Sequence, residues 1–407
     1  MTTYNEHILP NGLRIIHEAS PTDTVYCGLF VNAGTRDEEA ADLGLAHFCE
    51  HTSFKGTERR RVWHIRNGLE LVGGDLNAYT NKEATVFYAS VGRADWVRAA
   101  DLLFDIVFHS TYPQAELEKE TEVIIDEIDS YNDSPAELIF DEFEEMVFRG
   151  HELGRSILGR AERLRTYRTE DALRFTGRYY CASNVTFFVY GRVDFRQVVR
   201  LARKYGGALP AGAPRKQRTP LPDYRPERRE AMHGTHQAHV MMGNRGYSSD
   251  DPRRTALFLL NNILGGPGMN SLLNVQLREK NGLVYTAEST AFSYTDTGVW
   301  SVYYGCDEAD VNRCRDLVLR QLRRLREHPL SAAQVRRAQK QLTGQIRIAS
   351  DSFESYALAM AKTYAQTGRH RDVDAICRNL MALTPDDLQA VAQDVFAEDK
   401  LTMLVYR

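Results

Sequence analysis

The sequence predicts an α+β protein built from two homologous halves, each with a mainly antiparallel sheet packed against helices. The chain has 407 residues, more than the roughly 250–300 residues that one hydrophobic core usually organises. Five of its thirteen prolines lie between residues 210 and 226, which divides the chain almost in half. In each half, strand patterns come first and runs of helices follow, an order typical of α+β domains.

In the first half, residues 6–9 and 13–17 form a predicted hairpin around the turn Pro10-Asn11-Gly12. The later elements are assigned from apolar periodicity, β-branched content and proline positions. They are a helix over 38–54, a strand over 85–91, a helix over 96–109 and, after Pro113, a helix over 114–131.

The second half repeats this order, with a strand over 299–304 and helices over 311–326 and 332–348. Such parallel order indicates an internal duplication. We therefore expect a domain over 1–208, a proline- and arginine-rich linker over 209–230, and a homologous domain over 231–407. Proline stiffens an extended path, and we expect the linker's basic side chains to form a solvated face.

Composition excludes several classes of protein. The chain is 43% apolar and 26% charged with a net charge of −4, which argues against disorder and gives no bulk attraction to nucleic acid or membranes. No apolar run reaches the roughly 18 residues of a membrane span. Because the first residues lack a signal-peptide pattern and the six cysteines form no C-x-x-C pair, we expect free thiols and a cytoplasmic location.

The segment His47-Phe48-Cys49-Glu50-His51 carries the sharpest chemical signal. On a helix, His47 and His51 are one turn apart and project from one face. Two neutral imidazoles suit Zn²⁺, whose catalytic sites use three protein ligands and one water. Glu50 lies beside the pair, where a carboxylate can take the proton of a metal-bound water and later return it. The alternative is a solvated helix with two surface histidines.

A third ligand can come from the acidic helix that follows. Glu120 and Glu127 are seven residues apart and share one helical face. One carboxylate can complete the metal site, and the other can fix the tautomer of a histidine ligand. Taken separately, each glutamate is more simply explained as a solvated side chain.

The H-x-x-E-H order is the signature of inverzincins, and the chain as a whole resembles the M16 metallopeptidase family, the pitrilysin and mitochondrial-processing-peptidase group. It looks most like the short bacterial members. The resemblance rests on further motifs in both halves, namely residues 44–46, 54–57, 73–80 (G-G-x-x-N-A-x-T) and 277–285 (R-E-x-x-G-L-x-Y). It implies that Glu127 is the third zinc ligand, that Glu120 supports a histidine, and that the two halves close like a clam shell.

The resemblance also implies how substrate is held. In the family, the segment containing Asn77 and Ala78 is an edge strand to which a peptide adds as a further strand, by backbone hydrogen bonds. Arg278 and Tyr285 of the second half correspond to the residues that hold the substrate and its oxyanion, and both side chains are suitable hydrogen-bond donors for that charge.

Only the first half carries metal ligands. Aligning Leu117 with Val335 places Ala338 opposite Glu120 and Gln345 opposite Glu127, and no H-x-x-E-H occurs after residue 210. Three other features that resemble ligand sites have simpler structural explanations. We expect Cys49 to pack in the core, the histidines at 233, 236 and 239 to bind no metal, and the glycines at 265–268 to form a turn.

The sequence therefore predicts a zinc endopeptidase that cleaves extended or unfolded polypeptides, with Glu50 as the general base. A non-catalytic or partner-dependent subunit of an M16-like heterodimer is the alternative. We expect a homodimer or a heterodimer with a homologous subunit, and neither nucleic acid nor membrane as a partner. A structural zinc protein would need four closed ligands, and no fourth ligand has a suitable spacing.

Overall fold

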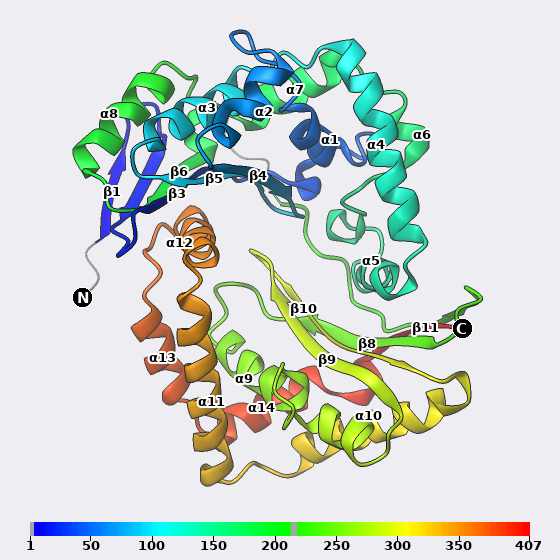
Figure 1. The fold of residues 1–407 in the computed structure, drawn as a ribbon. Coiled ribbons are helices and arrows are strands. Elements are labelled where there is room, and N and C mark those ends of the chain that lie inside the picture. The colour runs from blue at the N-terminus through cyan, green and yellow to red at the C-terminus, as the bar shows by residue number, and fades with distance from the viewer. Residues whose placement is uncertain (1–3, 213–217) are drawn as a thin grey trace. The chain divides into compact units, whose positions relative to one another are not determined.

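A computed structural model describes residues 4–212 and 218–407, which form two compact units (Figure 1). The first unit contains the chain up to Asp129, Arg155–Thr219 and Ala349–Arg371. The second contains Ser130–Gly154, Pro220–Ile348 and Asp372–Arg407. Each unit thus includes a segment from the opposite half of the sequence. The expected domains 1–208 and 231–407 divide the chain by sequence position alone. The sequence did not predict this exchange of segments between the two units.

The first unit is organised by a six-stranded sheet with the order β1-β2-β6-β3-β5-β4. Its neighbouring strands are antiparallel except for the parallel pair β2 and β6. The strands are β1 (Tyr4–Ile8), β2 (Arg14–Glu18), β3 (Thr24–Val31), β4 (Asp75–Thr80), β5 (Thr85–Gly92) and β6 (Val185–Tyr190). The predicted hairpin is therefore formed by β1 and β2, and β4 is an edge strand.

Helices contact both faces of the central strands, so every residue of β6 is buried. The helix α3 packs on β3 and β5, while α12, supplied by the second half of the sequence, packs on β2, β3 and β6. The helices of this unit are α1 (Leu45–Thr52), α2 (Val62–Glu70), α3 (Trp96–Phe108), α4 (Gln114–Asn132), α6 (Ala161–Leu164), α7 (Thr169–Tyr179), α8 (Phe195–Gly206) and α12 (Phe353–Thr367).

A buried polar cluster attaches α12 to the sheet of the first unit. The Glu18 carboxylate of β2 accepts hydrogen bonds from the Tyr356 hydroxyl, at 2.9 and 3.1 Å, and lies 2.6 Å from the His370 Nε2 atom. The Tyr356 ring also packs on Tyr190 of β6, with ring centroids 5.1 Å apart. The exchanged helix is thus held by both apolar and charged contacts.

The second unit contains a five-stranded sheet with the order β7-β11-β8-β10-β9, antiparallel except between β7 and β11. Its helix α5, from the first half of the sequence, packs on β8, β10 and β11. The strands are β7 (Arg228–Ala231), β8 (Ala238–Gly246), β9 (Val284–Ser293), β10 (Gly298–Cys306) and β11 (Thr402–Tyr406). The helices are α5 (Pro135–Val147), α9 (Arg254–Gly265), α10 (Val311–Glu327), α11 (Ala332–Ser350), α13 (Val373–Met381) and α14 (Pro385–Val395).

The structure confirms the α+β class and the mainly antiparallel sheets, and it corrects one element. The predicted helix over 38–54 is too long, since α1 begins only at Leu45, after Gly44 with φ +82°. The last residues of the expected linker over 209–230 belong to β7, which begins at Arg228; residues 213–217 of that linker lie outside the described residues. None of the helices in the described chain is long and apolar enough to cross a membrane.

Candidate metal centre

The helix α1 directs its polar side chains away from the core of the first unit. Leu45, Ala46, Phe48 and Cys49 are fully buried in that core, and the Cys49 thiol lies 3.9 Å from a backbone oxygen of α7. The opposite side of the helix carries His47 and His51, whose ring centroids are 4.5 Å apart. The apolar spacing of a two-turn helix thus fixes which side chains remain available for chemistry.

Glu127, on α4, completes a group of three possible metal ligands. Its Oε2 atom lies 3.5 Å from His51 Nε2 and 3.9 Å from His47 Nε2. Within the described chain, His47, His51 and Glu127 are the set whose ligand atoms all lie within 4.8 Å of one another. Two imidazoles and one carboxylate match the ligand set of catalytic zinc sites, which leave a further position open.

The protonation of His47 also fits a metal ligand. Burial, together with the neighbouring His51, lowers the pKa of His47 to about 3, so its ring is neutral at physiological pH. Its Nδ1 atom is buried and has no hydrogen-bond partner among the described residues. His47 therefore lacks, among the described residues, the hydrogen-bond partner at Nδ1 that usually orients a histidine ligand.

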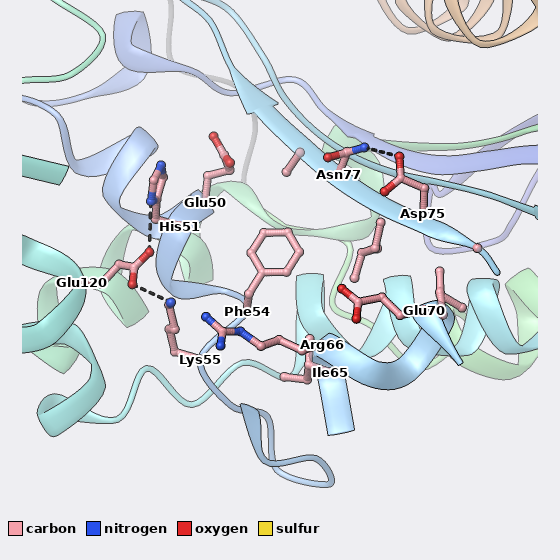
Figure 2. A pocket seen from close by; sticks show the side chains of 14 residues that line it. Glu50, His51, Phe54, Lys55, Ile65, Arg66, Glu70, Asp75, Asn77 and Glu120 are labelled. Atoms are coloured by element: carbon pink, nitrogen blue, oxygen red, sulfur yellow. Dashed lines mark hydrogen bonds and ion pairs between the residues drawn. The ribbon is translucent and has the colours of Figure 1, made fainter. Parts of the chain in front are cut away.

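Glu120 supports the second histidine (Figure 2). Its Oε1 atom lies 3.1 Å from His51 Nδ1, and its Oε2 atom lies 2.5 Å from the Lys55 ammonium. Burial disfavours the charged carboxylate, but the hydrogen bonds from His51 and Lys55 outweigh it and lower the pKa of Glu120. An ionised Glu120 holds the proton of His51 on Nδ1 and leaves Nε2 facing Glu127.

His51 has the opposite electrostatic balance to His47. Burial disfavours its charge, but the hydrogen bond to Glu120 and the nearby Glu50 and Glu127 carboxylates outweigh burial and raise the pKa of His51. A cation at Nε2 would compete with that second proton and benefit from the same carboxylates. The local field around His51 therefore attracts positive charge.

Glu50 lies beside the histidines and is nearly fully buried. Its Oε2 atom accepts a hydrogen bond of 3.0 Å from the Thr80 hydroxyl of β4. Burial raises the pKa of Glu50, partly offset by His51 and by the Thr80 hydrogen bond. A carboxylate with a raised pKa and a fixed orientation is suited to accept and return a proton.

A cavity of about 380 Å³ opens beside this group, between α1, α2 and β4 (Figure 2). Phe54, Ile65, Leu69 and Leu76 give it an apolar wall, and Asn77 and Ala78 belong to its strand side. Within the described chain β4 pairs only with β5. Its other edge therefore retains backbone groups that can pair with an added strand.

Arg278 and Tyr285 belong to the second unit. Arg278 lies in a short π-helical segment, Asn274–Glu279, and Tyr285 is near the start of β9 with 82% of its surface exposed. Both side chains are accessible donors, and their predicted contact with substrate stays a prediction.

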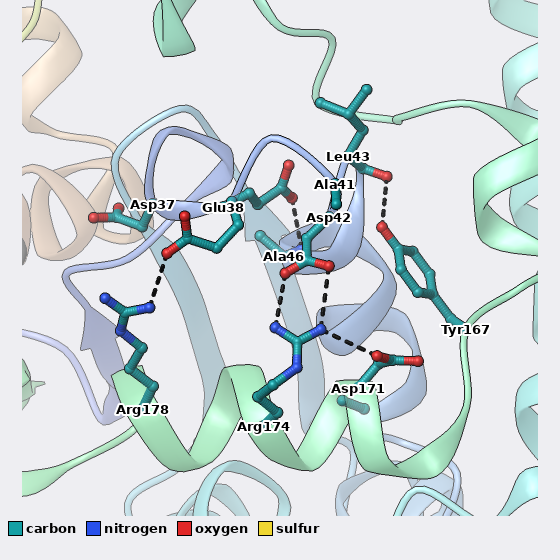
Figure 3. Close-up of polar contacts among 12 residues, drawn as sticks. Asp37, Glu38, Ala41, Asp42, Leu43, Ala46, Tyr167, Asp171, Arg174 and Arg178 are labelled. Atoms are coloured by element: carbon teal, nitrogen blue, oxygen red, sulfur yellow. Dashed lines mark hydrogen bonds and ion pairs between the residues drawn. The ribbon is translucent and has the colours of Figure 1, made fainter. Parts of the chain in front are cut away.

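The sequence did not identify the residues that anchor the start of α1 (Figure 3). The buried Glu38 carboxylate accepts hydrogen bonds from the backbone N–H groups of Gly44, at 3.0 Å, and Ala46, at 2.8 Å. Asp42 forms a two-point ion pair with Arg174 of α7, at 2.7 and 3.1 Å. The signal for this cap was an acidic residue followed by a glycine just before the apolar helical pattern.

Two glycines allow the chain to approach the start of α1 closely. Gly44 and Gly159 both have positive φ, +82° and +77°. A Cβ atom on Gly44 would lie 2.7 Å from Gly159 Cα and 2.8 Å from the Leu158 carbonyl oxygen. This contact places the loop before α6 against the first turn of α1.

The segment after α1 is anchored by Asp105 of α3. Its carboxylate accepts hydrogen bonds from Thr57 Oγ1 at 2.7 Å, Arg59 Nε at 2.9 Å and Arg60 Nη1 at 2.6 Å. Burial disfavours the charge on Asp105, but these donors outweigh it and lower its pKa. The helix that carries His47, Glu50 and His51 is thus fixed on both sides.

The chain is similar in sequence and in fold to known proteases. An uncharacterised zinc protease of Streptomyces coelicolor is 33% identical over 97% of this chain and 87% of its own length. The beta subunit of the mitochondrial-processing peptidase of Saccharomyces cerevisiae is 30% identical over 93% of this chain and 86% of its own. A protease from Helicobacter pylori has the same fold, with a TM-score of 0.90 at 20% identity and full coverage of both chains.

Two family descriptions cover most of the sequence. Residues 14–161 match the family described as insulinase (peptidase family M16), and residues 168–342 match the peptidase M16 inactive domain. The first match contains the proposed metal ligands, and the second contains Arg278 and Tyr285. Together with the full-length relatives, they show that this chain belongs to the M16 peptidase family.

Proposed function

We propose that this protein is a zinc-dependent endopeptidase that hydrolyses extended or unfolded polypeptides. The observation that carries the proposal is the convergence of His47, His51 and Glu127 within 4.8 Å, with Glu50 close enough to interact electrostatically with His51 and Glu127. The Streptomyces relative, similar over almost the whole chain, is named a zinc protease, which supports the same chemistry here.

The ligand set fits Zn²⁺, which when bound supplies a Lewis acid and lowers the pKa of a coordinated water. Glu50 then takes the proton of the attacking water and delivers it to the leaving amine. The Thr80 hydroxyl holds the Glu50 carboxylate in one orientation, at 3.0 Å. Glu120 keeps the His51 proton on Nδ1, so that the ring presents its Nε2 lone pair.

Substrate binding is assigned to the free edge of β4. A peptide that adds to this edge must be extended and forms hydrogen bonds through its backbone. Binding of this kind depends little on the amino-acid sequence of the substrate. Asn77 and Ala78 lie on this strand beside Glu50. In the proposed reaction, Arg278 and Tyr285 donate hydrogen bonds to the substrate and to its oxyanion when the enzyme closes.

A partner-dependent subunit is the second candidate. The yeast relative is named a subunit of a processing peptidase, so a dissimilar partner that supplies part of the substrate site is the specific alternative to a self-sufficient enzyme. In either case we propose a cytoplasmic dimer, formed from two copies or with a homologous subunit.

The test compares the wild type with Glu50→Gln and His47→Ala for zinc content, native mass and cleavage of a reduced, unfolded protein. We expect Glu50→Gln to keep zinc and to lose activity by about 10²–10⁴-fold, the usual contribution of a general base. His47→Ala should lose both zinc and activity. Full cleavage by Glu50→Gln would refute the assignment, whereas a zinc-loaded but inactive wild type would favour the partner-dependent alternative.

A further inference from the structure

A second cavity lies within the second unit and has no role in the proposed peptidase reaction. Its volume is about 400 Å³, and it is bounded by α9, by the segment after it, and by the facing ends of α10 and α11. Its polar lining includes Asn262, Ser271, Arg324, His328 and Arg337. We propose that this cavity binds a small organic oxyanion, a carboxylate or a phosphate.

The charge of the lining supports an anionic ligand. Two arginines and a histidine line the cavity, and no aspartate or glutamate is among the described residues that do so. The chain as a whole has more acidic than basic residues, 55 against 51, and the cavity beside the metal centre is lined by four carboxylates. The charged side chains of this cavity are therefore all basic, unlike those of the chain as a whole and of the cavity beside the metal centre. Such a lining favours a negatively charged ligand.

The two arginines are available to a ligand. Neither Arg324 nor Arg337 forms an ion pair or a side-chain hydrogen bond with another described residue. Both are exposed, and some arginines of the same helices are engaged instead, such as Arg323 with Glu398 at 3.1 Å and Arg347 with Asp374 at 3.1 Å. An unpaired guanidinium keeps its planar set of donors for a carboxylate or phosphate.

A buried hydroxyl points to the same conclusion. One polar group of the lining is both buried and unpaired within the described chain. Ser271 is 4% exposed, and its hydroxyl lacks a hydrogen-bond partner among the described residues. Buried polar groups are rarely left unpaired, so a ligand or water that satisfies this hydroxyl is expected here.

The size and apolar part of the cavity limit the ligand. About 400 Å³ lies within the usual range for small-molecule sites, and it is more than a bare inorganic ion needs. Ile263, Leu272, Leu325 and Leu330 supply apolar surface. The ligand is therefore expected to combine an oxyanion with a compact apolar body.

The test measures binding by isothermal titration calorimetry to the full-length protein. The probes are N-acetyl-leucine for a carboxylate, phenyl phosphate for a phosphate, and N-acetyl-leucine amide as an uncharged analogue. The cavity variant is Arg324→Gln with Arg337→Gln. The control variant is Arg320→Gln with Arg336→Gln, which removes exposed arginines of the same two helices that do not line the cavity.

We expect saturable binding of at least one anionic probe and none of the amide, with affinity falling at higher salt. The cavity variant should weaken binding by about tenfold or more, because charge-assisted hydrogen bonds are lost, and the control variant should not. Whichever anion binds identifies the ligand as a carboxylate or a phosphate. Binding of neither anion, equal binding of the amide, or equal affinity of the two variants would overturn the proposal. Peptidase activity plays no part in this readout, so its outcome is separate from that of the proposed function.

Discussion

Substitution of Gly44 by alanine tests whether the start of α1 is fixed by a backbone contact. At φ +82° the left-handed conformation costs alanine roughly 1–2 kcal/mol. The new Cβ would also lie 2.7 Å from Gly159 Cα, and such overpacking against backbone costs roughly 1–3 kcal/mol. We therefore expect Gly44→Ala to lower the free energy of unfolding of the first unit by about 2–5 kcal/mol.

The matched control is Gly73→Ala, because Gly73 has φ +70° and no atom within 4 Å of an added Cβ. Gly73→Ala should therefore be destabilised only by the left-handed backbone conformation and by no steric contact. Urea denaturation of both variants separates the two contributions, and competition with a chelator shows whether a shifted α1 weakens zinc binding. If Gly44→Ala unfolds no more easily than Gly73→Ala and binds zinc as tightly, the close contact does not position the helix.

Three further outcomes are expected. Glu120→Gln should weaken zinc affinity by about 10–100-fold, the usual effect of losing a carboxylate behind a histidine ligand, while the exposed Glu118→Gln of the same helix should leave chelator competition unchanged. Asp105 has a lowered pKa in the folded state, so its stabilisation is present above its ordinary pKa and is lost as the pH falls through the folded value. Asp105→Asn should therefore cost about 1–3 kcal/mol in urea denaturation at neutral pH, and its difference from the wild type should shrink below about pH 4; a constant difference would contradict this. Tyr356→Phe removes the hydrogen bond to Glu18 and should lower the stability of the first unit by roughly 1.5–3 kcal/mol, measured in the same way, whereas an unchanged midpoint would show that this bond does not hold α12.

Much of the fold follows from local sequence patterns. The valine- and aromatic-rich run at 299–304 lies within β10, Gly298–Cys306, and the periodic segments at 96–109 and 311–326 correspond to α3 and α10 within one residue at their ends. These elements are long and strongly patterned, so packing against the sheet agrees with their intrinsic preference.

The start of α1 shows where such reasoning fails. Residues 38–44 contain no proline and continue an apolar pattern, yet the side chain of Glu38 binds the backbone of Gly44 and Ala46 and replaces a helical turn. This choice depends on Arg174 and Gly159, which are more than a hundred residues away. Local periodicity carries no information about partners at that distance.

For the candidate site, spacing alone identified His47, Glu50 and His51, because their geometry is set within one helix. Glu127 became a specific ligand only through the family resemblance, since helical spacing left Glu120 and Glu127 interchangeable. Thr80 and Lys55 lie in the quoted motifs, but their contacts with Glu50 and Glu120 depend on how separate elements pack.

The exchanged helix α12 has a consequence for the order of events during synthesis. The first unit includes residues up to Arg371, although the proposed metal ligands have all left the ribosome once Glu127 has emerged. Nascent chains generally fold as their segments appear, yet this unit lacks one of its covering helices until nine-tenths of the polypeptide has been made. The sheet of the first unit is therefore expected to gain its last covering helix only late in synthesis, well after the proposed metal ligands have emerged.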